Sequence, residues 1–399
     1  MNTPRPLDGL RVIEVGQLLA GPFAGTFLGY FGAEVIKVEP PGKGDPIREW
    51  RLLDEDGTSY WWRSLGRNKQ SVTANLRSEK GREVVKRLAQ TADVLIENFK
   101  PGTMEKWGLG PEDLGETNPD LIYVRVSGYG QTGPYRKKPG YASVTEAFSG
   151  FRHLNGFKDR PPVRPNLSMG DSVAGLHAVL GVLMALLERQ QDRGTGGQVI
   201  DVALYESMFN LMEGVIPEFD GTGEIREPSG STLTGIVPTN TYLCSDDKHV
   251  VIGANGDSIY VRLMNAIGHS ELAEDTRLTS NAGRVEHQEL IDEAIAAWTI
   301  SKTSAKAMHI LEEAEVPVGL IYDVQDMIND PQYQSRELFE KVQIGEKTLT
   351  IPAILPKLSK TPGATIHPGP EVGGATMATL KNLGYSEAEL TNMKTNGDI

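Results

Sequence analysis

The sequence predicts an α/β protein, because short apolar strands alternate with helices along its N-terminal half. Residues 10–16 form a short apolar run that ends in glycine, which predicts a buried strand. A helix is expected over residues 18–31, with Pro22 near its first turn, and residues 33–39 form the next strand. Strand, turn, helix and strand in this order make the βαβ unit of a parallel sheet.

The pattern continues far enough to predict a domain organisation. Further strands are expected at 70–76, 93–99, 121–127 and 198–204, with a helix at 78–89. A stretch rich in Gly, Pro and Ser at 219–235 then marks a crossing into another domain. The expected parts are a Rossmann-like large domain (1–220), a smaller α/β domain (221–328) with a strand at 250–254 and helices near 257–267 and 287–314, and a return to the large domain (329–399) with a last helix at 375–383.

Composition limits the class of protein. A net charge of −13 argues against a nucleic-acid binder, which needs a basic face. The single cysteine, Cys244, excludes an internal disulfide and a cysteine-rich metal site, and the seven histidines are scattered, so no metal site is expected. The N-terminal residues lack a secretory signal, and we expect a cytoplasmic protein. The longest apolar run, 173–187, is shorter than the ~20 residues of a bilayer span.

Asp171 stands directly before that apolar run, which predicts a buried helix. One interpretation is an N-cap, since aspartate accepts hydrogen bonds from unpaired backbone N–H groups. The other is an anionic nucleophile that the helix macrodipole keeps ionised. His177, on the apolar helix, is expected to be a core histidine rather than a base. Residues 16–21 lack the G-x-G-x-x-G spacing of dinucleotide sites, which argues against that function.

Several stretches together resemble the class III CoA-transferases, the family of formyl-CoA and carnitine CoA-transferases and their succinyl-CoA-dependent relatives. The matching stretches occur in family order over almost the whole chain: 7–12, 20–22, 32–39, 44–45, 67–69, 97–102, 128–134, 170–171 and 196–202. The resemblance implies a CoA thioester as substrate, no permanently bound cofactor, and an interlocked homodimer.

The resemblance gives Asp171 a covalent role. In the family, the aspartate of the Gly-Asp pair attacks the acyl-CoA thioester and forms an acyl-aspartyl anhydride. The CoA thiolate then returns to make an aspartyl-CoA thioester, from which the acceptor acid takes CoA. A carboxylate suits this covalent catalysis because each intermediate preserves the energy of the thioester. A helix N-terminus would also supply N–H donors for the oxyanion.

The resemblance also implies a set of CoA-binding residues. Those at the channel are Gln17, Leu19, Ala20, Asn98, Phe99 and Tyr141, and those for the phosphates are Lys100, Lys106, Arg67 and Lys69. For the lysines, the alternative is a solvated surface role. Leu19 stands where oxalate-specific members carry glutamine, which argues against oxalate and formate as substrates.

The expected donor is succinyl-CoA or a similar dicarboxylyl-CoA, and the expected acceptor is a dicarboxylic acid or a hydroxy acid. Arg48 and Arg164 are candidates to bind a second carboxylate, because guanidinium groups bind carboxylates bidentately. Structural pairing with acidic residues is the alternative for both.

Two other functions stay open. In the α-methylacyl-CoA racemases, which resemble the same scaffold, a histidine is the acid/base partner of the aspartate. Tyr141 occupies that position here, and tyrosine, with a pKa of about 10, is a poor substitute near neutral pH. Ala142 departs from the aspartate that many transferases carry there. The second alternative is a non-catalytic CoA-binding protein, against which the presence of Asp171 argues.

Overall fold

The computed structural model describes residues 4–191, 194 and 196–399, and the chain divides into two compact units. The first unit contains Met1–Phe151, Pro165–Glu213 and Gln334–Ile399. The second contains Arg152–Arg164 and Gly214–Tyr333. The chain therefore crosses between units near the boundaries expected at 220 and 328. The assignment of residues 152–164 to the second unit was not expected.

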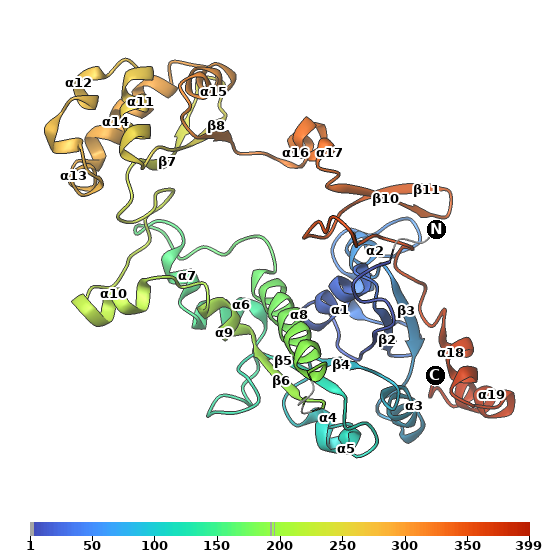
Figure 1. The fold of residues 1–399 in the computed structure, drawn as a ribbon. Helices are drawn as coiled ribbons and strands as arrows, with labels where there is room; N and C mark the ends of the chain where they lie inside the picture. The colour runs from blue at the N-terminus through green and yellow to red at the C-terminus, as the bar shows by residue number, and fades with distance from the viewer. Residues whose placement is uncertain (1–3, 192–193, 195) are drawn as a thin grey trace. The chain divides into compact units, whose positions relative to one another are not determined.

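A six-stranded parallel sheet forms the centre of the first unit, as the sequence predicts (Figure 1). Its strands are β1 (Arg11–Glu14), β2 (Glu34–Glu39), β3 (Lys69–Thr73), β4 (Val94–Glu97), β5 (Ile122–Ser127) and β6 (Val199–Ala203). They lie in the order β3-β2-β1-β4-β5-β6, which is the strand order of the Rossmann fold. The register is fixed at the centre, where Val12 of β1 pairs with Val35 on one side and Val94 on the other.

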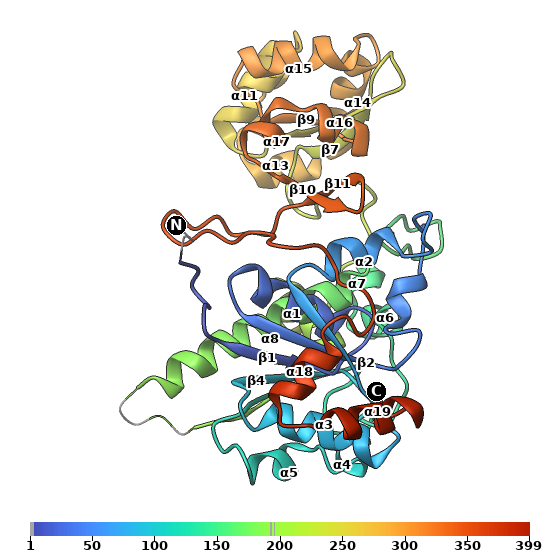
Figure 2. The same ribbon diagram turned by 90° about the vertical axis from the view of Figure 1, so that its right-hand side faces the viewer.

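Helices cover both faces of this sheet, because successive strand residues point to opposite sides. On one face, Val12 and its neighbours pack against α1 (Ala20–Tyr30) and α8 (Met169–Arg189). On the other face, Ile13 and its neighbours pack against α3 (Glu79–Ala89), α18 (Thr376–Asn382) and α19 (Glu387–Thr395). Figure 2 shows α18 and α19 beside α3, so the C-terminal segment completes this layer. The sequence did not predict α19.

The helix α8 is the longest of the unit and runs beside α1 (Figure 1). It has 21 residues, so the expectation that this stretch is too short to cross a bilayer is wrong by length and composition. Its residues Ala174, Ala178 and Val182 pack in the core against the sheet. A Cβ at Gly175 would lie 2.9 Å from the carbonyl oxygen of Ala20, so the two helices meet at a glycine near their N-termini.

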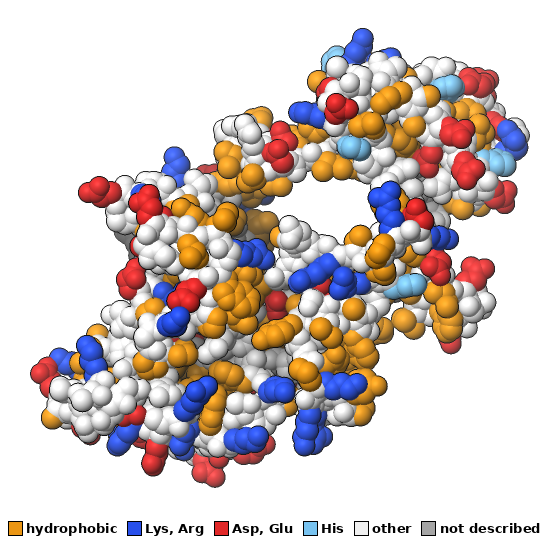
Figure 3. Space-filling model, turned by 180° about the vertical axis from the view of Figure 1, so that it is seen from behind, with side chains coloured by type: hydrophobic (Ala, Val, Ile, Leu, Met, Phe, Trp, Pro, Cys, Tyr) orange, Lys and Arg blue, Asp and Glu red, His pale blue; other side chains and the backbone are white. Residues whose placement is uncertain are grey.

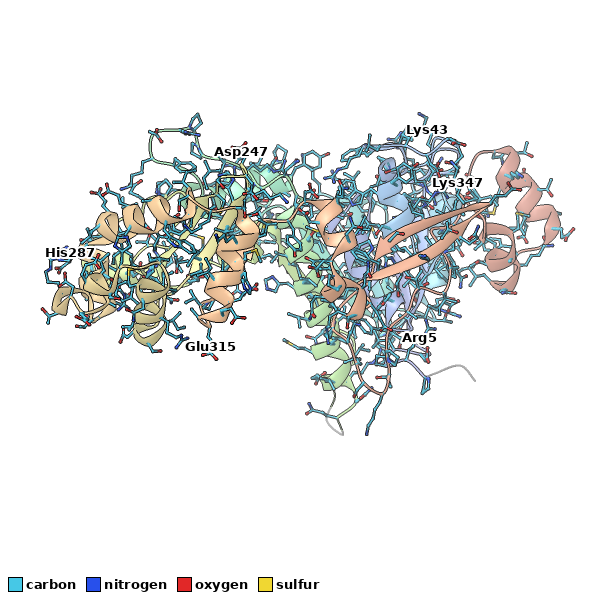
Figure 4. All side chains as sticks on the ribbon, turned by 90° about the horizontal axis from the view of Figure 1, so that it is seen from above. Arg5, Lys43, Asp247, His287, Glu315 and Lys347 are labelled. Carbon is cyan, nitrogen blue, oxygen red and sulfur yellow. The ribbon has the colours of Figure 1, made fainter. Side chains whose placement is uncertain are left out.

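The second unit contains a small antiparallel sheet with strands in the order β7-β8-β9. These are β7 (Thr239–Leu243), β8 (His249–Gly253) and β9 (Val318–Leu320), and Asp247 lies in the turn between the first two (Figure 4). Val250 and Ile252 of β8 pack against helices in one apolar core. The helices of this unit are α10 (Val215–Thr222), α11 (Asp257–Ala266), α12 (Ser270–Ala273), α13 (Asn281–Glu286), α14 (Gln288–Thr299), α15 (Ser304–Glu313) and α16 (Val324–Asn329).

The helix expected at 287–314 is in fact two helices. Thr303 caps the second one by accepting a hydrogen bond from the backbone N–H of Lys306. The remaining elements are η1 (Pro46–Glu49), α2 (Tyr60–Leu65), α4 (Thr103–Lys106), α5 (Pro111–Gly115), α6 (Ala142–Phe148), α7 (Phe151–Leu154), α9 (Leu204–Phe209), η2 (Thr276–Leu278), α17 (Pro331–Ser335), β10 (Phe339–Ile344) and β11 (Lys347–Pro352).

Candidate functional site

The sheet has one topological switch point, between its neighbouring strands β1 and β4. The chain leaves β1 toward α1, which packs on one face, and leaves β4 toward α4, whose Met104 packs on the other face. Open α/β sheets bind ligands where such loops diverge, at the carboxyl ends of the strands. The loops concerned are 15–19 after β1 and 98–102 after β4, and they contain five of the ten residues that the resemblance assigns to CoA.

The side chain of Asn98 joins these two loops. Its Oδ1 accepts a hydrogen bond from the backbone N–H of Gln17 at 2.8 Å, and its Nδ2 donates to the carbonyl oxygen of Gln17 at 2.7 Å. A Cβ at Gly16 would lie only 2.7 Å from this Oδ1, so the loop needs glycine there. The amide of Asn98 therefore holds the backbone of Gln17.

Asp45 holds the next residue of the same loop. Its carboxylate accepts from the backbone N–H of Leu18 at 3.0 Å, and Leu18 has a φ of +64°, in the left-handed region. Residues other than glycine are rare in that region, and they persist there when their surroundings impose the conformation. The loop after β1 is thus fixed from two sides, and Gln17, which is half-buried, lies at its centre.

Buried ion pairs lie beneath this loop. The ammonium of Lys37 contacts Glu14 at 2.9 Å and Asp45 at 2.8 Å, and that of Lys69 contacts Glu14 at 2.7 Å. Burial alone would lower the pKa of Lys37, but Glu14 and Asp45 outweigh it and raise the pKa above its usual value. For Lys69, burial dominates and lowers the pKa to about 8, although Glu14 opposes the shift.

The burial of Lys69 and Arg67 corrects the expectation that they bind CoA phosphates. Each side chain is about 1% exposed, so neither presents a cation to a ligand. Lys69 also donates to the carbonyl oxygen of Pro22. Arg67 donates to the carbonyl oxygens of Ser64 and Pro352. Both cations stabilise the interior of the first unit.

Arg48 is likewise not placed to bind a substrate carboxylate. Its guanidinium forms two hydrogen bonds with the buried carboxylate of Glu39, at 2.7 and 2.8 Å, and donates to the carbonyl oxygen of Pro370. It also lies over the ring of Trp62 at 3.8 Å. Arg48 therefore pairs with an acidic residue inside the protein, which was the alternative to binding a substrate.

Leu19 and Ala20 are buried, so their side chains cannot line an entrance as expected. Leu19 packs with Ile47, Trp62 and Leu65, and Ala20 packs in the core beside α8. Phe99 is half-buried and meets the ring of Trp107 edge-on, with centroids 5.2 Å apart. The side chains of these three residues therefore pack against the protein interior or against a neighbouring ring.

Lys100 and Lys106 are the two predicted phosphate ligands whose side chains are exposed. Lys100 follows β4 in the loop that Asn98 anchors, and Lys106 is the last residue of α4. Both belong to the segment that leaves the switch point. Their side chains are therefore accessible to solvent, and their predicted contact with phosphates stays a prediction.

Asp171 lies within the first turn of α8 and is not its N-cap, which is Ser168. Its side chain is half-buried. The backbone N–H of Gly170, the preceding residue, donates to Oε1 of the buried Glu146 at 3.1 Å. This N–H is therefore occupied and is not among the donors at this helix start that could serve an oxyanion. Glu146 was not predicted from the sequence, because no local pattern marks it.

Tyr141 and Ala142 lie at the start of α6, next to that turn. Tyr141 is at the N-cap position, with 75% of its side chain exposed, so it can contact a ligand. Ala142 is buried, and a Cβ at Gly170 would lie 3.2 Å from its Cβ. An aspartate at 142 would put a second carboxylate beside Glu146, so alanine suits this packing.

Arg164 belongs to the second unit, whereas Asp171 belongs to the first. Arg164 is exposed. Its predicted contact with a substrate carboxylate stays a prediction. Among the residues that the structure describes, no group of three or more His, Cys, Asp or Glu side chains is placed to hold a metal ion.

Comparison with known proteins connects this geometry to a family. The family model described as CoA-transferase family III matches residues 7–376. The chain belongs to CoA-transferase family III. It is therefore a CoA-transferase, as the ordered motifs indicate.

Relatives of this family III CoA-transferase cover nearly its whole length. It is 47% identical over 395 residues to a succinyl-CoA–D-citramalate CoA-transferase of Chloroflexus aurantiacus, covering 98% of this chain and 97% of that protein. It is 31% identical to the human succinyl-CoA:glutarate CoA-transferase, covering 96% and 87%. A CaiB/BaiF family protein from Brucella suis has a similar structure, with a TM-score of 0.84, 32% identity, and coverage of 95% and 100%.

Proposed function

We propose that this enzyme moves CoA from succinyl-CoA, or a related dicarboxylyl-CoA, to a dicarboxylic or hydroxy-acid acceptor. The position of Asp171 carries this proposal, because a half-buried carboxylate lies in the first turn of a core helix beside the carboxyl edge of the sheet. The names of the relatives support it, since they combine succinyl-CoA with citramalate, malate or glutarate. The acceptor is proposed as an acid of this class.

The proposed chemistry passes through covalent intermediates on Asp171. The carboxylate attacks the thioester carbonyl carbon, the C–S bond breaks, and the CoA thiolate leaves an acyl-aspartyl anhydride. The thiolate then attacks the aspartyl carbonyl carbon, which releases succinate and gives an aspartyl-CoA thioester. The acceptor carboxylate attacks the aspartyl carbonyl carbon of that thioester, which releases the CoA thiolate and forms a new anhydride. The thiolate then attacks the acceptor's carbonyl carbon in this anhydride, which gives the product acyl-CoA and frees the Asp171 carboxylate. Each step exchanges one activated acyl group for another, so the thioester energy is kept.

The binding of CoA is proposed at the loops that diverge between β1 and β4. Lys100 and Lys106 would contact its phosphates, Tyr141 and Gln17 would line the channel, and Asn98 and Phe99 would hold its walls. The arrangement supports this because the two lysines are exposed on the segment after β4. No permanently bound cofactor is needed by this chemistry.

The proposal is tested by a panel of acyl-CoA donors against a panel of acids, with products separated by chromatography. We expect transfer from succinyl-CoA to at least one C4 or C5 dicarboxylic acid, and loss of transfer in Asp171→Asn. If no donor in the panel supports transfer, the proposed substrate class is wrong. If α-proton exchange of a branched acyl-CoA appears instead, the racemase alternative applies.

We also propose a cytoplasmic homodimer. Support comes from an apolar stripe on the exposed side of α8, at Leu176, Leu180, Met184 and Leu187, whose exposed fractions run from 40% to 65%. Figure 3 shows that hydrophobic side chains also reach the surface of another face among charged ones. Light scattering would measure the dimer, and Leu180→Glu should shift it toward monomer; an unchanged mass in that variant would place the interface elsewhere.

A further inference from the structure

Hydrogen bonds join the two ends of the loop 48–60 in the first unit. The backbone N–H of Ser59 donates to the carbonyl oxygen of Arg48 at 2.7 Å, and its Oγ donates to that of Trp50 at 2.6 Å. The N–H of Tyr60 donates to the carbonyl oxygen of Leu52 at 3.1 Å. The backbone on both sides of Arg51 is therefore held in place.

Arg51 has an unusual conformation within this loop. Its φ is +64°, in the left-handed region that residues other than glycine rarely adopt. Its side chain is exposed, and its guanidinium lies over the ring of Trp61 at 3.8 Å from the centroid. A cation stacked in this way is oriented before any ligand arrives, while the hydrogen-bonding edge of its planar group still points away from the ring.

The acidic residues near Arg51 in the sequence are engaged with other cations, and Glu49, the nearest of them, contacts Lys43 at 3.6 Å. Lys347, at the start of β11 (Figure 4), contacts Asp54 at 3.1 Å and Glu55 at 2.8 Å. Asp56 pairs with Arg63. Among the residues that the structure describes, Arg51 has no carboxylate within ion-pair distance. An exposed guanidinium that is oriented by a stacked ring and pairs with no carboxylate of the described residues is suited to bind an external carboxylate bidentately.

Packing connects Arg51 to the turn that carries Asp171. Trp61, on which Arg51 stacks, packs in one apolar cluster with Phe23. A Cβ at Gly175 would lie 2.8 Å from Phe23, and Gly175 is one helical turn after Asp171. Trp61 and Phe23 therefore pack against the same apolar cluster, and Phe23 also approaches α8 one turn after Asp171.

We propose that Arg51 binds the carboxylate at the far end of a dicarboxylic acyl group or acid, and so selects dicarboxylic substrates. The inference rests on the proposed function, whose donor is a dicarboxylyl-CoA. Arg51 takes the role of binding a second carboxylate, for which Arg48 was a candidate from the sequence. Arg48 is buried and pairs with Glu39. The thioester end of the substrate then lies at Asp171, and the free carboxylate lies at the guanidinium.

The test compares succinyl-CoA with butyryl-CoA, which has the same chain length without the second carboxylate. We expect Arg51→Ala to lower kcat/KM for succinyl-CoA by roughly 10- to 100-fold, the range of one charge-assisted bidentate contact. The value for butyryl-CoA should stay within about twofold. Arg51→Lys should lose part of the preference, since it keeps the charge without the planar fork. Arg77→Ala, an exposed arginine before α3, is the matched control.

Equal losses with both thioesters would overturn the proposal and indicate a contact with CoA itself, and unchanged values with both would also overturn it. A second measurement separates this inference from the proposed function. Calorimetric binding of the two thioesters is compared in Asp171→Asn and in Asp171→Asn with Arg51→Ala. If the wild-type enzyme transfers no CoA but the binding preference for succinyl-CoA disappears with Arg51, the function proposal fails and the recognition role stands.

Discussion

Glu146 accepts a hydrogen bond from the backbone N–H of Gly170 at 3.1 Å, and it thereby joins α6 to the turn of α8 that carries Asp171. Glu146 is fully buried. The contact holds the backbone next to Asp171, the proposed nucleophile. One N–H group at this helix start thus donates to a protein carboxylate and is not available to a ligand oxygen.

This contact predicts a difference between two substitutions of Glu146. Glu146→Ala leaves the Gly170 N–H without this acceptor, and we expect kcat to fall roughly 10-fold or more with little change in KM for the acyl-CoA. Glu146→Gln keeps an acceptor oxygen and should recover most of the rate. Steady-state kinetics of folded protein, checked by circular dichroism, would measure both. Equal activity in wild type and Glu146→Ala would show that the contact does not position Asp171.

The hydrogen bonds between Asn98 and Gln17 predict coupled effects. Because the amide of Asn98 holds the backbone of Gln17, its loss should disturb what Gln17 contacts. We expect Asn98→Ala and Gln17→Ala each to weaken CoA binding, and the double variant to be little worse than Asn98→Ala alone. Calorimetric titration with CoA would measure the cycle. Strictly additive losses would mean that the side chain of Asn98 contacts CoA independently.

Lys69 predicts a pH dependence of stability. Its pKa is about 8 in the folded protein and near its usual 10.5 when unfolded, so the unfolded chain binds more protons between these values. Stability from this group therefore rises with pH from 8 to 10.5. The free energy of unfolding of wild type minus that of Lys69→Met should grow by up to roughly 3 kcal/mol over that window. Denaturant titrations at pH 7.5 and 10 would measure it, and a constant difference would contradict the assignment.

Gly25 of α1 predicts a steric effect on the same ion pairs. A Cβ there would lie 2.0 Å from Oε2 of Glu14, the carboxylate that pairs with Lys37 and Lys69. We expect Gly25→Ala to destabilise the protein by roughly 2 kcal/mol or more. Gly115→Ala, at a helical glycine with open space around it, is the control and should be neutral or stabilising by ~1 kcal/mol. Chemical denaturation would show whether the two variants differ.

The sheet could be predicted from the sequence because its strands are local signals. Each is a short run bounded by turns or helices, and most residues of β1 to β5 are buried, as in Val94–Glu97, whose four residues are all buried. Helix α19 was missed although Ser386 and Glu389 form a capping box at its start, a pattern readable from the sequence. The break between α14 and α15, at Thr303, was missed in the same way.

The cations were harder to assign, because their partners are distant in sequence. Lys69 pairs with Glu14 from another strand, and Arg67 reaches Pro352 near the end of the chain. A motif match cannot distinguish a lysine that faces a ligand from one that faces the interior. Asp171 could be proposed because a carboxylate before an apolar helix is a local pattern. Glu146, which accepts a hydrogen bond from the start of that helix, has no such pattern.

The central claim is that Asp171 becomes acylated and then carries CoA. Mass spectrometry of the intact protein after incubation with succinyl-CoA, followed by peptide mapping after borohydride or hydroxylamine trapping, tests it most directly. We predict a CoA adduct or a trapped modification on the peptide that contains Asp171, absent in Asp171→Asn. An enzyme that transfers CoA while this peptide stays unmodified would contradict the account.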